Sequence, residues 1–229
     1  MKPRLAILIS GRGSNMAALI AAAALPAYPA QVALVIADRP EAPGLALAAE
    51  AGIPTAVIPS AGRPRPDFEA ALQAGLEAQE IGFIALAGFM RVLTPEFVAR
   101  WEGRMLNVHP SLLPAFPGLD THARALAAGV RLHGCTVHLV SAGVDEGPIL
   151  AQAAVPVLEG DTAEALAARV LVQEHLLYAA ALSWLVDGHA WLEAGRVVVA
   201  APASAGVLAN PLPELPGLPT HGSQTQGAR

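Results

Sequence analysis

Short hydrophobic runs alternate with longer amphipathic stretches through the first half of the chain. Nearly uninterrupted runs of this kind are typical of parallel strands that are buried on both faces. The stretches between them are rich in alanine, leucine and other helix-forming residues. The predicted strands are residues 4–9, 31–37, 55–58, 82–87 and 105–109, and the predicted helices are residues 16–24, 44–51, 67–80 and one that begins after Thr94. This alternation predicts a parallel sheet with helices packed on it.

The alternation ends at His109. Two further predicted strands, 134–140 and 149–158, are joined by a short loop, which favours an antiparallel pair. A long predicted helix, 163–186, and a final predicted strand, 191–199, follow. The sequence therefore predicts an α/β fold with an open, mainly parallel twisted sheet and an antiparallel C-terminal addition.

The composition divides the chain into two parts. Residues 1–200 carry all of the periodic patterns, so they are predicted to form one domain. Residues 201–229 contain five prolines among glycine, serine and glutamine and have little hydrophobic periodicity. Such a segment cannot bury enough apolar surface to offset the entropy of ordering, so a disordered tail is predicted.

Charge and composition narrow the function classes. A net charge of −5 without a basic cluster argues against a nucleic acid partner. The single cysteine, Cys135, cannot form an internal disulfide and fits a reducing, cytoplasmic environment. The longest uncharged run, 13–37, is interrupted by prolines and polar residues, so no membrane segment is predicted. The sequence leaves open whether two copies form a homodimer.

Candidate chemistry lies at the end of the strand 105–109. Asn107 and His109 occupy positions i and i+2, which point to the same face of a strand. Open α/β sheets bind their ligands at the carboxyl ends of the strands. Asp145 lies in a later glycine-rich loop that can turn back toward His109. An amide, an imidazole and a carboxylate together can stabilise a developing oxyanion and transfer protons.

Plainer interpretations exist for these residues. Asn107 and His109 can be a polar strand end before a proline turn, or part of a hydrogen-bonded structural cluster. His133 and His138 flank Cys135 in a way that resembles a zinc site. Strand alternation places these two histidines on opposite faces, however, and the chain has no second cysteine, so no metal site is predicted.

A second candidate site is the glycine-rich segment 10–15, which reads Ser-Gly-Arg-Gly-Ser-Asn between a predicted strand and a predicted helix. This order directs free backbone N–H groups and the positive end of a helix dipole at an anion, typically a phosphate. Ala17 and Ala18 replace the later glycine of the dinucleotide fingerprint, so a dinucleotide is not predicted. A tight turn without a ligand is the alternative.

Five motifs occur in the order in which a known family has them. They are Ile-Ser-Gly-Arg-Gly-Ser-Asn at 9–15, Leu-Ala-Gly-Phe-Met-Arg at 86–91, Asn-Val-His-Pro-Ser-Leu-Leu-Pro at 107–114, His-Gly-Cys-Thr-Val-His at 133–138 and Asp-Glu-Gly-Pro at 145–148. Through them the chain resembles the folate-dependent phosphoribosylglycinamide formyltransferases of purine biosynthesis, from about residue 4 to residue 192. The resemblance implies a Rossmann-like formyltransferase fold. It also implies transfer of the formyl group of 10-formyltetrahydrofolate, a co-substrate, to the amine of glycinamide ribonucleotide.

The resemblance also implies a role for individual residues. The implied catalytic residues are Asn107, His109 and Asp145; the implied ribonucleotide-binding residues are Gly13, Ser14, Asn15 and Glu174; the implied folate-binding residues are Arg65, Met90, Arg91, Val92, Leu93 and Asn107. Asn107 and His109 are expected to donate hydrogen bonds to the oxyanion, and Asp145 to take the amine proton. The segment 90–93 is expected to provide backbone edges and apolar walls for the pteridine, with plain core packing as the alternative. No metal is implied.

Related functions remain possible from the sequence. A methionyl-tRNA formyltransferase would need a basic C-terminal domain, and a formyltetrahydrofolate deformylase would carry an N-terminal regulatory domain. A non-catalytic nucleotide-binding module would explain the glycine-rich loop but would leave Asn107, His109 and Asp145 without a role. Here a neutral, proline-rich tail follows the predicted domain and the first predicted strand begins by Leu5, so the purine enzyme is expected rather than these three.

Overall fold

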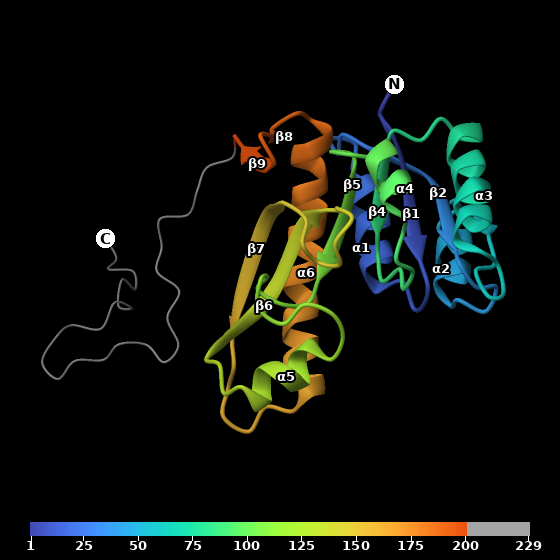
Figure 1. The fold of residues 1–229 in the computed structure, drawn as a ribbon. Coiled ribbons are helices and arrows are strands. Elements are labelled where there is room, and N and C mark those ends of the chain that lie inside the picture. Colours follow the sequence, from blue (N-terminus) through green and yellow to red (C-terminus); the bar gives the residue numbers. More distant parts are fainter. Residues whose placement is uncertain (201–229) are drawn as a thin grey trace, which may run out of the picture.

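A seven-stranded sheet forms the centre of the computed structural model, which describes residues 1–200 of the chain (Figure 1). Its strands are β1 Arg4–Ile9, β2 Gln31–Ala37, β3 Thr55–Val57, β4 Phe83–Leu86, β5 Met105–His109, β6 Leu132–Leu139 and β7 Ile149–Pro156. Their order is β3-β2-β1-β4-β5-β6-β7. Each pair of neighbours in the run β3-β2-β1-β4-β5 is parallel, whereas the β5–β6 and β6–β7 pairs are antiparallel. The predicted fold class is confirmed. The predicted tail, 201–229, lies outside the described residues.

Six helices in the described part cover both faces of the sheet. They are α1 Ser14–Ala23, α2 Gly44–Glu50, α3 Arg65–Ala78, α4 Pro95–Arg100, α5 Thr121–Ala127 and α6 Ala163–Val186. Strand β1 separates two cores: Leu5, Ile7 and Ile9 pack with α1, α2, α5 and α6, while Ala6 and Leu8 pack with α3 and α4. Successive strand residues point to opposite faces, so a strand between two helical layers must be apolar at every position.

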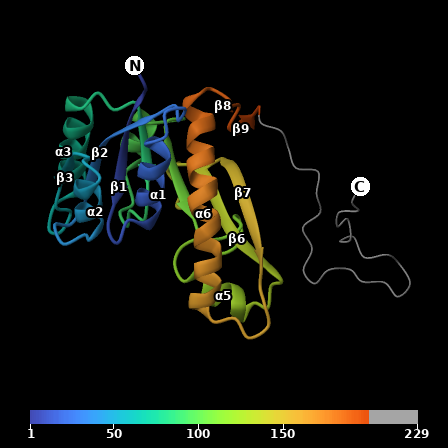
Figure 2. The ribbon, with the colours of Figure 1, turned by 180° about the vertical axis from the view of Figure 1, so that it is seen from behind.

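The C-terminal helix α6 lies along the antiparallel part of the sheet (Figure 2). By length and composition it is the one described helix that could cross a membrane. Its buried side chains face β5, β6, β7 and α1, however, and they include Glu174 and Tyr178. In this domain α6 is therefore a core helix.

The end of the described chain differs from the prediction. The predicted single strand 191–199 is wrong, because the segment forms a hairpin of β8 Ala190–Glu193 and β9 Arg196–Val199. Ala194 and Gly195 have φ values of 48° and 77° and reverse the chain between the two strands. Two-residue hairpin turns of this kind need positive φ. Alanine rarely adopts it, so the sequence carried only a weak turn signal.

Candidate active site

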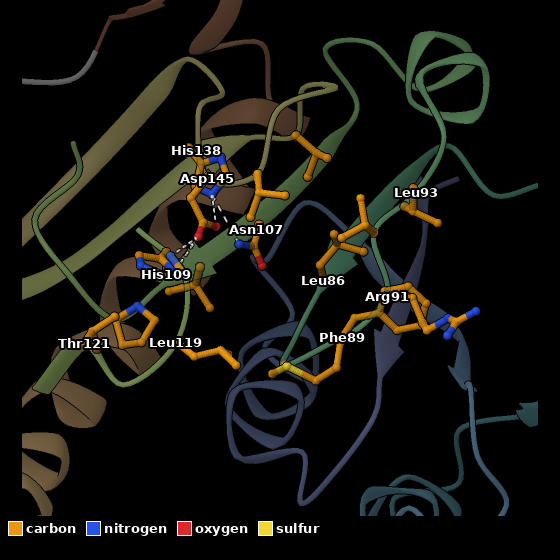
Figure 3. Close-up of a pocket in the computed structure, with 18 of the residues that line it drawn as sticks. Leu86, Phe89, Arg91, Leu93, Asn107, His109, Leu119, Thr121, His138 and Asp145 are labelled. Carbon is orange, nitrogen blue, oxygen red and sulfur yellow. Dashed lines mark hydrogen bonds and ion pairs between the residues drawn. The ribbon is translucent and has the colours of Figure 1, made fainter. Parts of the chain in front are cut away.

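The catalytic candidates meet where β5 ends. The antiparallel ladder places Asn107 opposite His138 and His109 opposite Thr136. Partners that lie directly opposite each other in a ladder share a face. Asn107, His109 and His138 therefore lie on one face of the sheet, beside the loop that joins β6 to β7 (Figure 3).

The loop between β6 and β7 brings Asp145 to this cluster. Its Oδ2 lies 3.3 Å from Nδ1 of His109 and accepts a 2.8 Å hydrogen bond from the backbone N–H of Gly118. Its Oδ1 lies 3.9 Å from Nε2 of His138. The predicted approach of Asp145 to His109 is thus present in the structure, and the backbone of Gly118 holds the carboxylate in place.

Glycine at position 147 is required for this loop geometry. A Cβ atom built at Gly147 would lie 1.7 Å from the carbonyl oxygen of Leu139 in β6. Asp145 itself has a φ of 57°, in the left-handed region that aspartate adopts more readily than most residues. The loop therefore packs directly against the end of β6, and this close packing positions the carboxylate.

His138 controls the orientation of the Asn107 side chain. Its Nδ1 donates a 2.9 Å hydrogen bond to the carbonyl of Leu139, which leaves Nε2 as an acceptor for Nδ2 of Asn107 at 3.2 Å. Burial lowers the pKa of His138, which favours this neutral ring. The amide oxygen of Asn107 points away from His138 (Figure 3). No role was predicted for His138 from the sequence, because its position opposite Asn107 depends on the β5–β6 register.

His109 is buried between two acceptors. Its Nε2 donates a 3.0 Å hydrogen bond to the carbonyl of Phe116, and its Nδ1 faces Asp145. A neutral imidazole carries one N–H, whereas an imidazolium carries two and satisfies both acceptors. His109 therefore has a hydrogen-bond acceptor beside each of its ring nitrogens. The backbone carbonyl of Phe116 is a further member of the site that no motif indicated.

A cavity of about 640 Å³ opens beside these residues. This volume lies within the range of small-molecule sites, roughly 300–1,000 Å³. Its walls are formed by residues 88–93, 107–110, 118–122 and 140–145, together with Asn15, Leu86, Val98, His138 and Glu174. The cavity is large enough for an organic molecule, and His109 and Asp145 form part of its lining.

The predicted folate segment forms one wall of this cavity. Met90 and Val92 are exposed at its rim, while Leu93 is buried. The N–H of Met90 donates to Oγ of Ser10 at 2.9 Å, which ties this segment to the glycine-rich loop. The guanidinium of Arg91 lies 6.0 Å from the ring centroid of Phe68. Arg65, the first residue of α3, does not line the cavity.

The glycine-rich loop ends at the N-terminus of α1. Gly13, with a φ of 75°, precedes the helix, and no side chain caps its first N–H groups. Nδ2 of Asn15 donates a 2.6 Å hydrogen bond to Oε2 of Glu174. Burial raises the pKa of Glu174, and the bond from Asn15 opposes this shift. Asn15 and Glu174 line the cavity, whereas Gly13 and Ser14 lie outside its lining.

Two further histidines lie near the site. The rings of His122 and His133 meet edge to face with centroids 5.2 Å apart, and His122 also lines the cavity. Burial lowers the pKa of His133 to about 4, so this ring is neutral near pH 7. Within residues 1–200, no group of three or more His, Cys, Asp or Glu side chains is arranged to hold a metal ion.

Comparison with known proteins identifies the family. Residues 3–182 match the family described as Formyl transferase, which is well over half of the chain. The chain belongs to the formyl transferase family. The resemblance inferred from the five motifs is therefore confirmed, and the trio of Asn107, His109 and Asp145 lies within the matched region.

Several members of the family are close in sequence and structure. The chain is 42% identical to phosphoribosylglycinamide formyltransferase of Escherichia coli (strain K12) over 199 residues, which covers 83% of this chain and 94% of the relative. A crystal structure of phosphoribosylglycinamide formyltransferase from Brucella melitensis is 56% identical, with a TM-score of 0.78, and the match covers 81% of this chain and 96% of that one. The human trifunctional purine biosynthetic protein adenosine-3 is 46% identical over 198 residues, or 86% of this chain. The chain spans only 20% of that longer protein.

Proposed function

We propose that this formyl transferase moves the formyl group of 10-formyltetrahydrofolate to the amine of glycinamide ribonucleotide, a step of purine (IMP) biosynthesis. The observation that carries the proposal is the cluster of Asn107, His109 and Asp145 on the wall of a cavity of about 640 Å³. The match to phosphoribosylglycinamide formyltransferases along most of their length supports it.

The two substrates would bind on different segments. The folate would lie along 88–93, with its pteridine against the apolar walls and its anionic end toward Arg91 and Arg65. The ribonucleotide phosphate would lie at Gly13 and Ser14, where α1 has uncapped N–H groups. Asn15 and Glu174, which reach the cavity, would bind the ribose part.

The transfer would begin with attack of the neutral amine on the formyl carbon. A C–N bond forms, and the carbonyl electron pair moves to the oxygen as an oxyanion. We assign the oxyanion to the Nδ1–H of protonated His109, because its 3.3 Å contact with Asp145 is longer than its Nε2 bond to Phe116. The amide oxygen of Asn107 would accept an N–H of the amine. The Nδ2 group of Asn107 has two hydrogens, and His138 accepts only one of them. The other remains available to the oxyanion.

Proton transfer would complete the reaction. Asp145 would take the proton that the attacking nitrogen loses, directly or through one water. The oxyanion would then collapse to the new formamide as the bond from the folate nitrogen to the formyl carbon breaks and His109 gives that nitrogen a proton. The proton on Asp145 would pass back to His109, so that both side chains regain their starting states. These side chains supply an oxyanion donor, an acid and a base, so the proposal assigns no step to a metal.

A formyl transfer assay tests the proposal. The protein is mixed with a 10-formyl folate, with and without glycinamide ribonucleotide, and both the deformylated folate and the formylated ribonucleotide are measured. Formylated product that depends on the ribonucleotide supports transfer, and it should persist after exhaustive chelation. Formate release without the ribonucleotide would instead indicate a deformylase. Absence of both reactions would favour a non-catalytic nucleotide-binding module.

The setting of the enzyme is part of the proposal. A single cysteine and a net charge of −5 favour a cytoplasmic enzyme that acts on small molecules, without nucleic acid or a membrane as partner. Analytical ultracentrifugation at several concentrations distinguishes a monomer from a homodimer.

A further inference from the structure

The side chain of Tyr178 joins two neighbouring strands of the sheet, β4 and β5. It lies on α6 and is fully buried. Its hydroxyl oxygen is 3.0 Å from the carbonyl oxygen of Leu86 in β4 and 3.1 Å from that of Leu106 in β5. A hydroxyl has one hydrogen, so it donates to one carbonyl at a time and remains between the two.

The position of this hydroxyl along the sheet is informative. The β4–β5 ladder pairs Ile84 with Met105, Ala85 with Leu106 and Leu86 with Asn107, and it ends there. Beyond this point β4 continues into the cavity wall 88–93, and β5 presents Asn107 and His109. Tyr178 therefore contacts both strands where they separate to form opposite parts of the site.

The same helix reaches the third part of the site. Glu174 lies four residues before Tyr178, one helical turn away on the same face, and it accepts the hydrogen bond of Asn15. Helix α6 thus contacts the glycine-rich loop, the strand that leads to the predicted folate segment and the catalytic strand. Burial keeps the pKa of Tyr178 well above its ordinary value, so the hydroxyl stays protonated.

We propose that Tyr178 is a positioning residue, whose hydroxyl fixes the separation of the ends of β4 and β5. The inference rests on the proposed function: the folate bound on one strand end and the amine held at the other must meet at reaction distance. Tyr178 does not line the cavity, so it acts through the two strands and not by touching a substrate. Small misplacements of reacting groups lower the rate far more than they weaken binding.

The test is the substitution Tyr178→Phe, which removes the hydroxyl and keeps the ring. We expect kcat to fall about tenfold while the KM values of both substrates stay within about twofold. The segments that bind the substrates are unchanged, but the alignment of the reacting groups is lost. The matched control is Tyr28→Phe. The Tyr28 hydroxyl donates a 2.8 Å hydrogen bond to the carbonyl of Ala179 on the same helix and makes none to β4 or β5. The Tyr28→Phe substitution should leave kcat unchanged.

Hydrogen exchange supplies a readout that does not need activity. In Tyr178→Phe, amides of 86–93 and 105–109 should exchange faster than in the wild type, and in Tyr28→Phe they should not. A wild-type kcat in Tyr178→Phe, an equal loss in both variants, or unchanged exchange at these segments would each overturn the inference. An inactive wild type would overturn the proposed function instead, and the exchange rates would still decide the role of Tyr178.

Discussion

The two halves of the sheet contribute to the site in different ways. The parallel half, β1 to β4, offers mainly backbone: the uncapped start of α1 and the segment 88–93. The antiparallel half, β5 to β7, offers side chains, namely Asn107, His109, His138 and Asp145. The backbone groups of the parallel half come from single short loops. The side chains of the antiparallel half come from three separate segments: β5, β6 and the loop between β6 and β7.

Topology explains this difference. In the parallel half every strand ends at the same edge of the sheet, so each following loop reaches the ligand site by itself. In the antiparallel half, β6 returns beside β5 and places its side chains opposite those of β5. We therefore expect changes in the parallel half to affect mainly substrate binding, and changes in the antiparallel half to affect mainly turnover.

The strongest test in the antiparallel half is Asp145→Asn. It keeps the size of the side chain but removes the charge beside His109 and the proposed proton acceptor. Steady-state kinetics should show a kcat lower by roughly 10²–10⁴, with both KM values little changed. Glu146→Gln, at the adjacent and exposed carboxylate, is the control. Equal losses in the two variants would contradict the role of Asp145.

Gly147→Ala tests whether the β6–β7 loop positions that carboxylate. The new Cβ cannot be accommodated 1.7 Å from the Leu139 carbonyl, so the loop must move. We expect kcat to fall about tenfold and the free energy of unfolding in urea to fall by about 2 kcal/mol. At Gly75 in α3, where the nearest atom is Ile58 Cδ1 at 4.0 Å, alanine should instead stabilise the protein. A Gly147→Ala variant with normal kcat would show that the loop tolerates displacement.

In the parallel half, Ser14→Asp sets a negative charge against the proposed phosphate site at the start of α1. Calorimetric titration should show the ribonucleotide binding about tenfold more weakly, with folate binding unchanged. Ser14→Asn has nearly the same shape without the charge and should bind both ligands almost normally. Equal weakening of both ligands would mean that the loop is damaged and that the two halves are not separable in this way.

The antiparallel half also contains a residue, His133, that should make the stability of the protein depend on pH. The folded-state pKa of His133 is lowered from 6.5 to about 4 by burial, so between these values the unfolded chain binds a proton that the folded chain does not. Stability that is present at neutral pH is therefore lost as the pH falls from 6.5 toward 4. His133→Phe keeps an aromatic ring and should show a shallower loss in urea unfolding. The two proteins compared at about pH 8 give the packing change alone. Identical slopes would exclude His133 as the source.

The smallest effect is expected at the end of the chain. Removal of residues 201–229, which lie outside the described residues, should leave kcat and the melting temperature unchanged, because their composition offers little surface to bury. Removal from residue 189 onward also deletes the β8–β9 hairpin, which packs on β7 and buries Ala190. That cut should lower the melting temperature by several degrees. A loss of activity on removing 201–229 alone would show that this segment contributes to the domain.

The sequence predicted the regular elements well because their signals are local. The bounds of β1, β2, β5 and α6 were predicted to the residue, since each is a hydrophobic run or a capped amphipathic stretch. Thr162, for example, accepts the N–H of Ala165 as an N-cap. The hairpin at 190–199 was missed because its turn depends on a positive φ at Ala194. The approach of Asp145 to His109 was predicted, and it is present at 3.3 Å.

The sequence by itself determined the α/β class, the parallel strands and the family, because hydrophobic period, caps and motifs are properties of neighbouring residues. Only the tertiary structure decided how the candidate catalytic side chains are held. The β5–β6 register places His138 opposite Asn107, where it accepts a hydrogen bond from the Asn107 amide and so orients it. The carbonyl of Phe116 accepts the Nε2–H of His109. Tyr178 reaches Leu86 and Leu106 from a helix far along the chain. These contacts join segments that meet only when the strands have assembled into the sheet and the helices pack on it, so no local pattern encodes them.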